Sequence, residues 1–411
     1  MTETTYLIIG GGVAGTTAAE TIRQSDKEGS IVVVSDEPYR FYSRIMLSKP
    51  NFFLEKIPFD QVWLKSEAWY SENKVTLLAG KRATQLDTQN KVATLSDGSQ
   101  WHYQKLLLAI GTCARKWGVP GAEKKGVLSL RNLDDAKEII SRVKTAKQAI
   151  LIGSGFISFE MTEMLRMAGV AVTLVILESY YWEPLLDGAS GRMIEGVLEK
   201  NGVKILHKSE VAEVVGGETV EGVVLKDGTR LPCQLIIAGI GTLCPHEWIK
   251  SAGVGVNRGI LANEFLETST PDVLTAGDCS EFNDLILGEN IQLGNWVNAQ
   301  IQGKVAGANM LGQTQPFKMV SFYTAQGFGI AIAFVGDVRL ASDREVILRG
   351  SPQAGSYGRL ILRGGKLMGA TLLNLTRELG FLSKLIEKGV DLSPNKQNLS
   401  DLSFDLAKII G

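Results

Sequence analysis

The sequence predicts an α/β protein, and three observations lead to that prediction. A short apolar run, Tyr6–Ile9, ends in a glycine cluster that opens a segment with apolar residues at helical spacing. The same strand–glycine–helix pattern returns over 149–160. From residue 317 onward, short strand-like runs precede amphipathic helices. We therefore expect two Rossmann-like dinucleotide-binding domains and a small α+β C-terminal domain.

The first nucleotide unit carries three glycines with different roles. Gly10 allows a tight turn, Gly12 lets a pyrophosphate approach the backbone, and Gly15 lets the helix pack closely on the strand. Val13 and Ala14 begin that helix. Its unpaired N–H groups and positive dipole end would face the phosphates.

A second strand is predicted over Ile31–Ser35, and two acidic residues follow it, Asp36 and Glu37. A carboxylate at this point can accept a hydrogen bond from a ribose hydroxyl. A glycine-rich hairpin or an ordinary strand–helix turn is the alternative interpretation. The register of strand, helix, second strand and acid favours a dinucleotide site.

Composition narrows the class of protein. The chain has 411 residues, of which 45% are hydrophobic and 21% charged, as is ordinary for a globular protein. A net charge of −1 gives no field that would attract nucleic acid or an anionic membrane. No apolar run approaches the roughly 20 residues of a spanning helix, and the N-terminus lacks the pattern of a signal peptide. We expect a cytoplasmic protein with no membrane span and no nucleic-acid partner.

Cysteines and histidines are few and are not clustered. The cysteines and histidines are Cys113, Cys233, Cys244, Cys279, His102, His207 and His246. We expect the four cysteines to be buried free thiols. No pair has a metal-ligand spacing, and no histidine lies beside a candidate nucleophile. We therefore predict no metal site and no hydrolysis of the Ser/Cys–His kind.

An aromatic and basic segment, 37–50, follows the first unit. It is either a surface loop with a short helix or a segment that brings Arg44 and Lys49 to a pyrophosphate or a flavin ring. A mixed helix and hairpin region follows, with a turn at Asp97–Gly98, and 106–112 reads as a buried strand that ends in glycine.

The second nucleotide unit is imperfect. It keeps Gly153 and Gly155, but Ser158 occupies the third glycine position. After the strand predicted at 170–175, the expected acid is displaced by two residues to Glu178. No Arg or Lys cluster is present there to hold a 2′-phosphate, so NADH is favoured over NADPH.

The remaining elements are predicted from turns and periodicity. A hairpin turns at Asp227–Gly228, and strands run into the glycines of 239–241 and 277. A helix is predicted from 295 to 310. The C-terminal strands are predicted at 329–334, 359–362 and 367–372; one helix would carry Leu379, Leu382, Leu385 and Ile386, and a second Leu402, Leu406 and Ile409 behind Ser400 as N-cap.

The order of these motifs resembles the FAD-dependent pyridine nucleotide–disulfide oxidoreductase superfamily. Two glycine fingerprints, an Ala109-x-Gly111-Thr112 strand end and a late Ala276-Gly277-Asp278 carry the resemblance over nearly the whole chain. The resemblance implies an FAD domain that is split by an inserted NAD(P)H domain. The implied boundaries are 1–114 and 241–315 for FAD, 115–240 for NAD(P)H, and 316–411 for an interface domain.

Two segments, 42–49 and 294–312, look like the branch that contains ferredoxin and rubredoxin reductases, apoptosis-inducing-factor-like flavoproteins and the flavin domain of nitrite reductases. By this resemblance Asp278 would hydrogen-bond the flavin ribityl chain, and Lys49 would lie beside the reactive edge of the flavin and pair with Glu160. Trp296 would either contact the isoalloxazine or simply pack. Thr112 and Arg115 would lie near the FAD, and Arg44 near its pyrophosphate. The other positions assigned to cofactor binding are Ala83, Ala109, Gly111, Gly277, Phe156, Ile157 and Gly241.

The Lys49–Glu160 pair also has a physical reason. A cation near the flavin stabilises the anionic reduced ring, and a buried lysine needs a partner to remain charged. The alternative is that Glu160 caps its own helix while Lys49 is solvated.

The sequence has no Cys-x4-Cys pair and no cysteine from 36 to 60, so we expect electrons to leave the flavin directly. We predict an FAD-dependent NAD(P)H oxidoreductase, a monomer or homodimer, that passes electrons to a small redox protein of the rubredoxin or ferredoxin type. The alternatives are a direct reductase of dioxygen, a quinone or another small acceptor, and an electron-transfer subunit of a larger complex.

Overall fold

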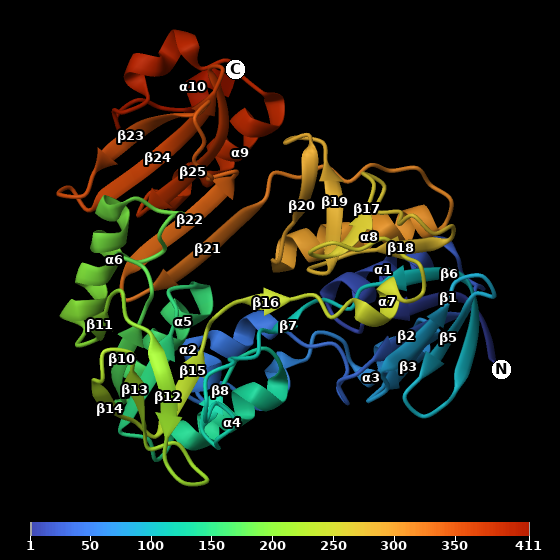
Figure 1. Cartoon of the computed structure of the whole chain (residues 1–411). Coiled ribbons are helices and arrows are strands. Elements are labelled where there is room, and N and C mark those ends of the chain that lie inside the picture. The colour runs from blue at the N-terminus through green and yellow to red at the C-terminus, as the bar shows by residue number, and fades with distance from the viewer. Residues whose placement is uncertain (1, 411) are drawn as a thin grey trace. The chain divides into compact units, whose positions relative to one another are not determined.

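A computed structural model describes residues 2–410, and Figure 1 shows its helices and strands. The chain forms two compact units. The first unit comprises the described residues up to Ser43, together with Phe59–Cys113 and Thr242–Met319. The second comprises Arg44–Pro58, Ala114–Gly241 and the described residues from Val320 onward.

The first unit is built on a seven-stranded sheet in the order β3-β2-β1-β6-β5-β4, in which β18 also pairs with β6. Strands β1, β2, β3, β6 and β18 are parallel, and β4 and β5 continue the sheet as an antiparallel hairpin. The strands are β1 (Thr2–Ile9), β2 (Ile31–Ser35), β3 (Val75–Ala79), β4 (Ala83–Asp87), β5 (Val92–Leu95), β6 (Gln100–Leu108) and β18 (Val273–Thr275). The predicted strand over 31–35 and the turn at Gly98 are confirmed.

Helices and smaller elements complete this unit. Helix α1 follows β1 and packs along α8, the helix predicted at 295–310. The helical elements are α1 (Val13–Ser25), η2 (Phe59–Val62), α3 (Glu67–Glu72), α7 (Glu247–Lys250) and α8 (Trp296–Met310). The remaining strands are β16 (Thr242–Leu243), β17 (Ile260–Ala262), β19 (Ser280–Asp284) and β20 (Glu289–Gln292).

The second unit contains another parallel sheet, in the order β11-β10-β9-β15-β8. A separate antiparallel sheet, β12-β13-β14, contains the predicted turn at Gly228. The strands are β8 (Val127–Leu128), β9 (Gln148–Ile152), β10 (Ala171–Val175), β11 (Lys204–Leu206), β12 (Val211–Val215), β13 (Gly222–Leu225), β14 (Arg230–Pro232) and β15 (Leu235–Ala238). The two-residue strand β7 (Cys113–Ala114) lies where the chain passes from the first unit to the second. The helices are α4 (Leu133–Val143), α5 (Phe156–Met167) and α6 (Gly188–Lys200).

The segment 44–58 belongs to this second unit for a packing reason. It forms η1 (Arg44–Ser48) and α2 (Pro50–Phe53). Phe53 is only 3% exposed and lies in the same hydrophobic core as Phe159 of α5. The short helix is therefore anchored to the helix of the second glycine unit.

The C-terminal part of the second unit is an antiparallel sheet in the order β21-β22-β25-β24-β23. Its elements are β21 (Phe322–Gly327), β22 (Ile330–Gly336), β23 (Glu345–Ser351), β24 (Ser356–Arg363), β25 (Lys366–Leu373), η3 (Thr376–Glu378), α9 (Leu379–Lys388), η4 (Ser393–Asn398) and α10 (Ala407–Ile410). The three predicted strands and the first predicted helix are confirmed, whereas β21 and β23 were not anticipated.

The second predicted C-terminal helix is wrong. Residues 402–406 form turns, and only α10 is helical. The cause is Arg349, whose buried guanidinium donates hydrogen bonds to the carbonyl oxygens of Leu399, Asp401 and Phe404. The carbonyl oxygen of Ser400 likewise accepts a hydrogen bond from Gly350 N. These carbonyl groups are therefore not available for helical hydrogen bonds, and the segment forms turns.

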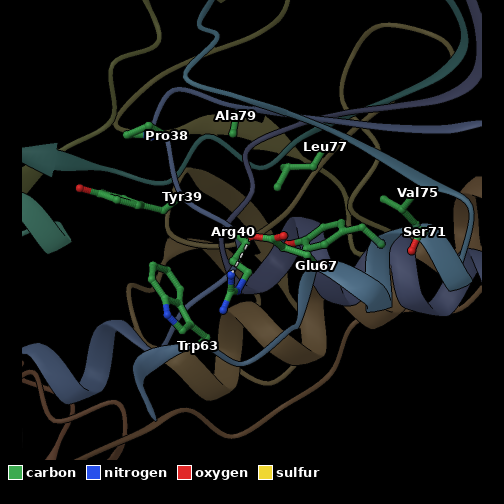
Figure 2. A pocket seen from close by; sticks show the side chains of 10 residues that line it. Pro38, Tyr39, Arg40, Trp63, Glu67, Ser71, Val75, Leu77 and Ala79 are labelled. Atoms are coloured by element: carbon green, nitrogen blue, oxygen red, sulfur yellow. Dashed lines mark hydrogen bonds and ion pairs between the residues drawn. The ribbon is translucent and has the colours of Figure 1, made fainter. Parts of the chain in front are cut away.

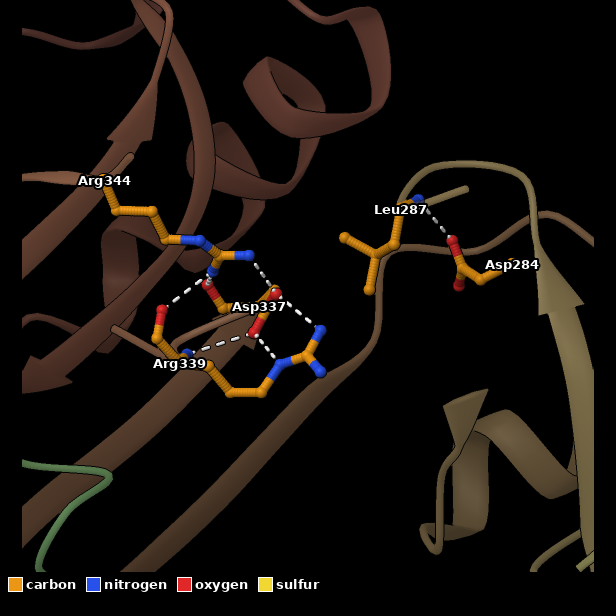
Figure 3. A network of polar contacts seen from close by, with 5 residues as sticks. All are labelled: Asp284, Leu287, Asp337, Arg339 and Arg344. Atoms are coloured by element: carbon orange, nitrogen blue, oxygen red, sulfur yellow. Dashed lines mark hydrogen bonds and ion pairs between the residues drawn. The ribbon is translucent and has the colours of Figure 1, made fainter. Parts of the chain in front are cut away.

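The connection between β22 and β23 is held by a buried carboxylate. Asp337 is 6% exposed, and the guanidinium groups of Arg339 and Arg344 approach it to 2.8 and 2.6 Å. Figure 3 shows both arginines turned toward Asp337. Burial by itself would raise the pKa of Asp337, but these hydrogen bonds outweigh it and lower the pKa to about 2.

In the part of the chain that the structure describes, no helix combines the length and the apolarity needed to cross a bilayer.

Candidate functional site

The first glycine motif has the geometry of a phosphate-binding turn. Gly10 has φ of +123°, and a Cβ there would lie 2.0 Å from the carbonyl oxygen of Ala109. A Cβ on Gly15 would lie 1.9 Å from Gly10 O. Gly10 is therefore required by its close approach to the end of β6, and Gly15 by the close packing of α1 on the glycine turn.

The N-terminus of α1 is open to a ligand. Its N-cap is Gly12, no side chain caps it, and its first turn has no acidic residue. A Cβ on Gly12 would meet nothing within 4 Å, so the space above this residue is free. The N–H groups of Val13 and Ala14 can therefore serve an anion, and these residues fit the pyrophosphate of FAD.

Small residues bring α8 against α1. A Cβ on Gly303 would lie 2.3 Å from Ala14 O, and one on Gly307 would lie 2.9 Å from Ala18 O. Because the helices approach so closely, the N-terminal part of α8 is held beside the glycine turn. The sequence motif Gly303-x-x-x-Gly307 could have indicated this contact.

Buried polar groups lie at the start of α8. Gln302 accepts a hydrogen bond of 2.7 Å from the N–H of Gly277, which has φ of +86°. The Gln302 Nε2 and Asn298 Oδ1 atoms are buried and have no hydrogen-bond partner among the described residues. Such orphaned groups fit a site that is completed by a ligand.

Asp278 is half-buried next to Gly277 and near Gly294, on which a Cβ would lie 3.6 Å from the Asp278 carboxyl carbon. Its main-chain oxygen accepts a hydrogen bond of 2.7 Å from Gln292 Nε2, which holds the backbone. Trp296 stacks on Phe41, with ring centroids 5.7 Å apart and an angle of 15° between planes. This stack is compatible with both alternatives for Trp296, contact with the isoalloxazine and packing alone.

The acids after β2 already have protein partners. Asp36 forms an ion pair of 3.1 Å with Arg82, the residue before Ala83, and both side chains are largely exposed. Glu37 accepts a hydrogen bond of 2.6 Å from the Tyr42 hydroxyl. A ribose at Asp36 would therefore share this carboxylate with Arg82.

The end of β6 lies beside the first glycine turn. Ala109 N donates to Ile9 O at 2.8 Å, and Gly111 has φ of +65°. Thr112 follows on a half-buried loop. Arg115, two residues into the second unit, has an exposed side chain, and its N–H donates to Gly241 O at 3.0 Å.

The second glycine motif repeats the geometry of the first. Gly153 has φ of +94°, and Gly155 is the N-cap of α5 without a side-chain cap. Ser158 is buried, and its hydroxyl donates to Ile152 O at 3.5 Å, so the substitution of the third glycine is accommodated. Gly241 has φ of +93°, and a Cβ there would meet nothing within 4 Å. These residues fit a second dinucleotide.

Phe156 and Ile157 begin α5, and their side chains are used in packing within the protein. The Phe156 ring packs against Trp182 at 4.7 Å and Tyr323 at 5.7 Å between centroids. Ile157 packs against the core of the same unit. Because both side chains are engaged in packing, the groups that Phe156 and Ile157 could present to a nucleotide are their backbone N–H groups.

Glu178, the displaced acid of the second unit, has one carboxylate oxygen without a protein partner among the described residues. The residue is half-buried shortly after β10, and this oxygen, Oε2, is buried. Nearby, burial and then the charge of Glu178 raise the pKa of the Tyr181 hydroxyl. An unpaired carboxylate oxygen favours a hydroxyl donor and disfavours a phosphate.

Lys49 and Glu160 form an ion pair within the second unit. The Lys49 Nζ donates to Glu160 Oε1, and the Ser48 hydroxyl donates to Oε2. The alternative, in which Glu160 caps its own helix and Lys49 is only solvated, is wrong because the two side chains are paired, although 41% of the Lys49 side chain is exposed. Sequence reasoning did not single out Ser48, although its position before Lys49 was a possible signal.

Arg44 lies in the same segment as Lys49. Its guanidinium donates a hydrogen bond of 2.7 Å to the carbonyl oxygen of Arg131, just before α4. This contact anchors η1 within the second unit.

The thiols are poorly suited to redox relay. Cys233, Cys244 and Cys279 are buried as expected, but Cys113 is exposed, and that expectation is wrong. Burial raises the pKa of Cys279 to about 11. All four cysteines lie within residues 2–410, and all are free. Within the same range, no group of three or more His, Cys, Asp or Glu side chains could hold a metal ion.

The sequence profile of the pyridine nucleotide-disulphide oxidoreductase family matches residues 4–303. The chain belongs to this family. The profile of the reductase C-terminal domain matches residues 322–410. The fold and the two glycine units agree with this assignment, and the protein is an FAD-dependent NAD(P)H oxidoreductase.

Relatives extend over most of the chain. The chain is 30% identical to the biphenyl dioxygenase system ferredoxin–NAD(+) reductase component of Paraburkholderia xenovorans, over 99% of this chain and 98% of the relative. It is also 30% identical to the nitrite reductase [NAD(P)H] of Bacillus subtilis over 94% of this chain, but it spans only 48% of that enzyme. The crystal structure of the ferredoxin reductase for the CYP199A2 system from Rhodopseudomonas palustris has a TM-score of 0.91 and 28% identity, and covers 99% of this chain and 100% of that one.

Proposed function

We propose that this oxidoreductase takes electrons from NADH and passes them to a small redox protein of the ferredoxin or rubredoxin type. The observation that carries the proposal is the state of Cys279, the thiol next to Asp278. It is fully buried, and its raised pKa of about 11 keeps it protonated at neutral pH. Without a thiolate relay at Cys279, electrons would leave the cofactor directly, as transfer to a small redox protein allows.

FAD, when bound, accepts hydride from NAD(P)H and releases electrons to an acceptor. The chain's own groups have separate tasks in this proposal. Gly10, Gly12 and Gly15 form the phosphate turn for FAD, and Gly153 and Gly155 form the turn for NADH. Asp278 would orient the ribityl chain by accepting hydrogen bonds from its hydroxyl groups.

Lys49 is assigned the electrostatic role. Its ammonium group would stabilise negative charge that develops on the reduced cofactor. Glu160, whose side chain is 13% exposed, orients that lysine through the ion pair, and Ser48 holds the other oxygen of the carboxylate. Arg44, tied to Arg131 O, would add positive charge near the pyrophosphate.

Two finer points belong to the same proposal. The unpaired Oε2 atom of Glu178 supports NADH as the donor, because a 2′-phosphate would meet like charge there.

We also assign FAD binding to residues 1–114 and 241–315, NAD(P)H binding to residues 115–240, and an interface role to residues 316–411. We propose that the protein is a cytoplasmic monomer or homodimer.

An anaerobic titration of the flavin-loaded protein tests the donor side. We expect NADH to bleach the flavin absorbance band at a lower concentration than NADPH does. Addition of oxidised ferredoxin or rubredoxin should then restore the band within the mixing time. Fast reoxidation by dioxygen or a quinone, with none by either protein, would refute the proposed acceptor class.

The match to nitrite reductase supports a second candidate, an electron-transfer subunit of a larger assembly. In that case NADH would still bleach the flavin, but turnover would require a separate protein with its own redox centre. Failure of both nucleotides to bleach the flavin would contradict both candidates.

A further inference from the structure

The first unit contains a cavity that lies outside every position assigned to a cofactor. It has a volume of about 580 Å³ and opens between α3 and β3, the edge strand of the sheet. Figure 2 shows its lining, in which Arg40 lies beside Trp63. A volume of this size is in the range of small-molecule sites.

The walls of the cavity suit a flat apolar body. Val75, Leu77 and Ala79 alternate along β3 and so present one face of the strand to it. Tyr39 and Trp63 form an aromatic wall, with ring centroids 6.0 Å apart. Rings and aliphatic groups placed in this way favour an aromatic ligand.

Arg40 supplies positive charge at the cavity. Its guanidinium carbon lies over the Trp63 ring, 4.6 Å from the centroid, so the positive charge faces the indole. One terminal nitrogen is 3.2 Å from Glu67 Oε1. The Nε atom is buried and has no hydrogen-bond partner among the described residues. Arg40 therefore keeps an unused donor.

Tyr70 offers a second donor. Its hydroxyl oxygen accepts a hydrogen bond of 3.0 Å from Phe41 N, so its own proton remains to be donated. Burial raises the pKa of this hydroxyl, which keeps it protonated. Glu67, the one carboxylate in the lining, is 88% exposed and can swing into solvent when another anion pairs with Arg40.

We propose that this cavity binds a small aromatic carboxylate, with the ring between Trp63 and the β3 side chains and the carboxylate on Arg40 and Tyr70. The cationic Arg40 guanidinium and the Tyr70 hydroxyl favour an anionic ligand, and the apolar walls favour a planar one. None of the residues that line the cavity belongs to the predicted cofactor positions. This proposal is therefore independent of which redox protein accepts electrons from the enzyme.

Calorimetry on the flavin-loaded full chain tests this proposal, with 2-naphthoate as the probe. We expect the wild-type protein to bind it, and Arg40→Gln to weaken binding at least about tenfold, because a charge-assisted hydrogen bond is lost. The matched control is Arg258→Gln, an exposed arginine of the same unit, which should leave the affinity unchanged. Flavin reduction by NADH should be the same in all three proteins.

A second comparison needs no variant and decides the matter if Arg40→Gln does not fold. The neutral analogue 2-naphthalenemethanol should bind wild-type protein at least about tenfold more weakly than 2-naphthoate. A dissociation constant for 2-naphthoate above about 1 mM would overturn the proposal, as would equal affinity for the two probes. Equal affinity of wild type and a folded Arg40→Gln variant would overturn it as well.

Discussion

The ammonium group of Lys49 is ion-paired with the carboxylate of Glu160, which lies 111 residues further along the chain. Lys49 is the N-cap of α2, and Glu160 lies in the second turn of α5. The Glu160 side chain is 13% exposed and that of Lys49 41%, so the carboxylate is the more desolvated partner. The pair therefore holds a cation at a defined place in the second unit.

Lys49→Ala should slow reduction of the flavin by NADH at least about tenfold, because the charge that stabilises the reduced cofactor is lost. Stopped-flow absorbance under anaerobic conditions measures this rate. Lys56→Ala, at an exposed position of the same segment, is the control and should react like wild type. An unchanged rate in Lys49→Ala, with the fold intact, would remove Lys49 from the mechanism.

Glu178→Ala should raise KM for NADH about tenfold and change KM for NADPH less, because only the NADH ribose would use the carboxylate as an acceptor. Steady-state kinetics with an artificial acceptor gives both constants. Glu199→Ala, on the exposed surface of α6, should change neither. Equal changes for the two nucleotides would show that Glu178 does not discriminate between them.

Gly303→Ala should weaken FAD retention and lower the melting temperature, because its Cβ would lie 2.3 Å from Ala14 O and force α8 away from α1. Gly196→Ala is a matched control in helix α6, where a Cβ meets nothing within 4 Å. It should stabilise the protein by about 0.5–1 kcal/mol. Thermal unfolding followed by flavin fluorescence separates the two outcomes, and an unaffected Gly303→Ala protein would contradict the packing argument.

Arg349→Met should destabilise the C-terminal sheet by about 3 kcal/mol, because it leaves Glu378 unpaired and releases the carbonyls of Leu399, Asp401 and Phe404. Denaturant unfolding monitored by circular dichroism measures the loss. Lys396→Met removes only an exposed pair with Glu345 and should cost no more than about 1 kcal/mol. Similar losses in the two variants would argue against the buried network.

The stability that Asp337 contributes should depend on pH. Its pKa is about 2 in the folded chain, below the ordinary value of 3.8. The contribution is therefore complete above about pH 4 and is lost as the pH falls through about 2. Asp337→Asn should melt at a lower temperature at neutral pH and lose less between pH 4 and 2 than wild type does. Asp343→Asn, at an exposed position of the same loop, should follow the wild-type profile.

Local signals in the sequence predicted the nucleotide units and most of the elements. The turns at Gly98 and Gly228 and the bends at Gly10 and Gly153 have the positive φ that their glycines indicated. Helix α8 runs from Trp296 to Met310 behind its Asn295 cap, close to the predicted range of 295 to 310. These features depend on neighbours within a few residues, which is why a single sequence reveals them.

Features that depend on distant residues were missed. Leu402, Leu406 and Ile409 have helical spacing, yet Arg349, about 50 residues earlier, binds the carbonyls that a helix would use. Strand β23 has little alternation of its own and is defined by pairing with β24. The cavity beside Arg40 requires α3 to cover β3, and neither segment carries a motif.

The sequence by itself determined that two glycine-rich turns begin helices without side-chain caps, because the absence of a Cβ is a property of each residue. It also determined that no paired thiols stand beside the first turn. The tertiary structure alone decided that Ser48 shares Glu160 with Lys49, that the segment 44–58 packs on α5, and that Arg40 keeps an unpaired donor. Burial and charge pairing are set by which surfaces meet on folding, and a linear pattern does not contain that information.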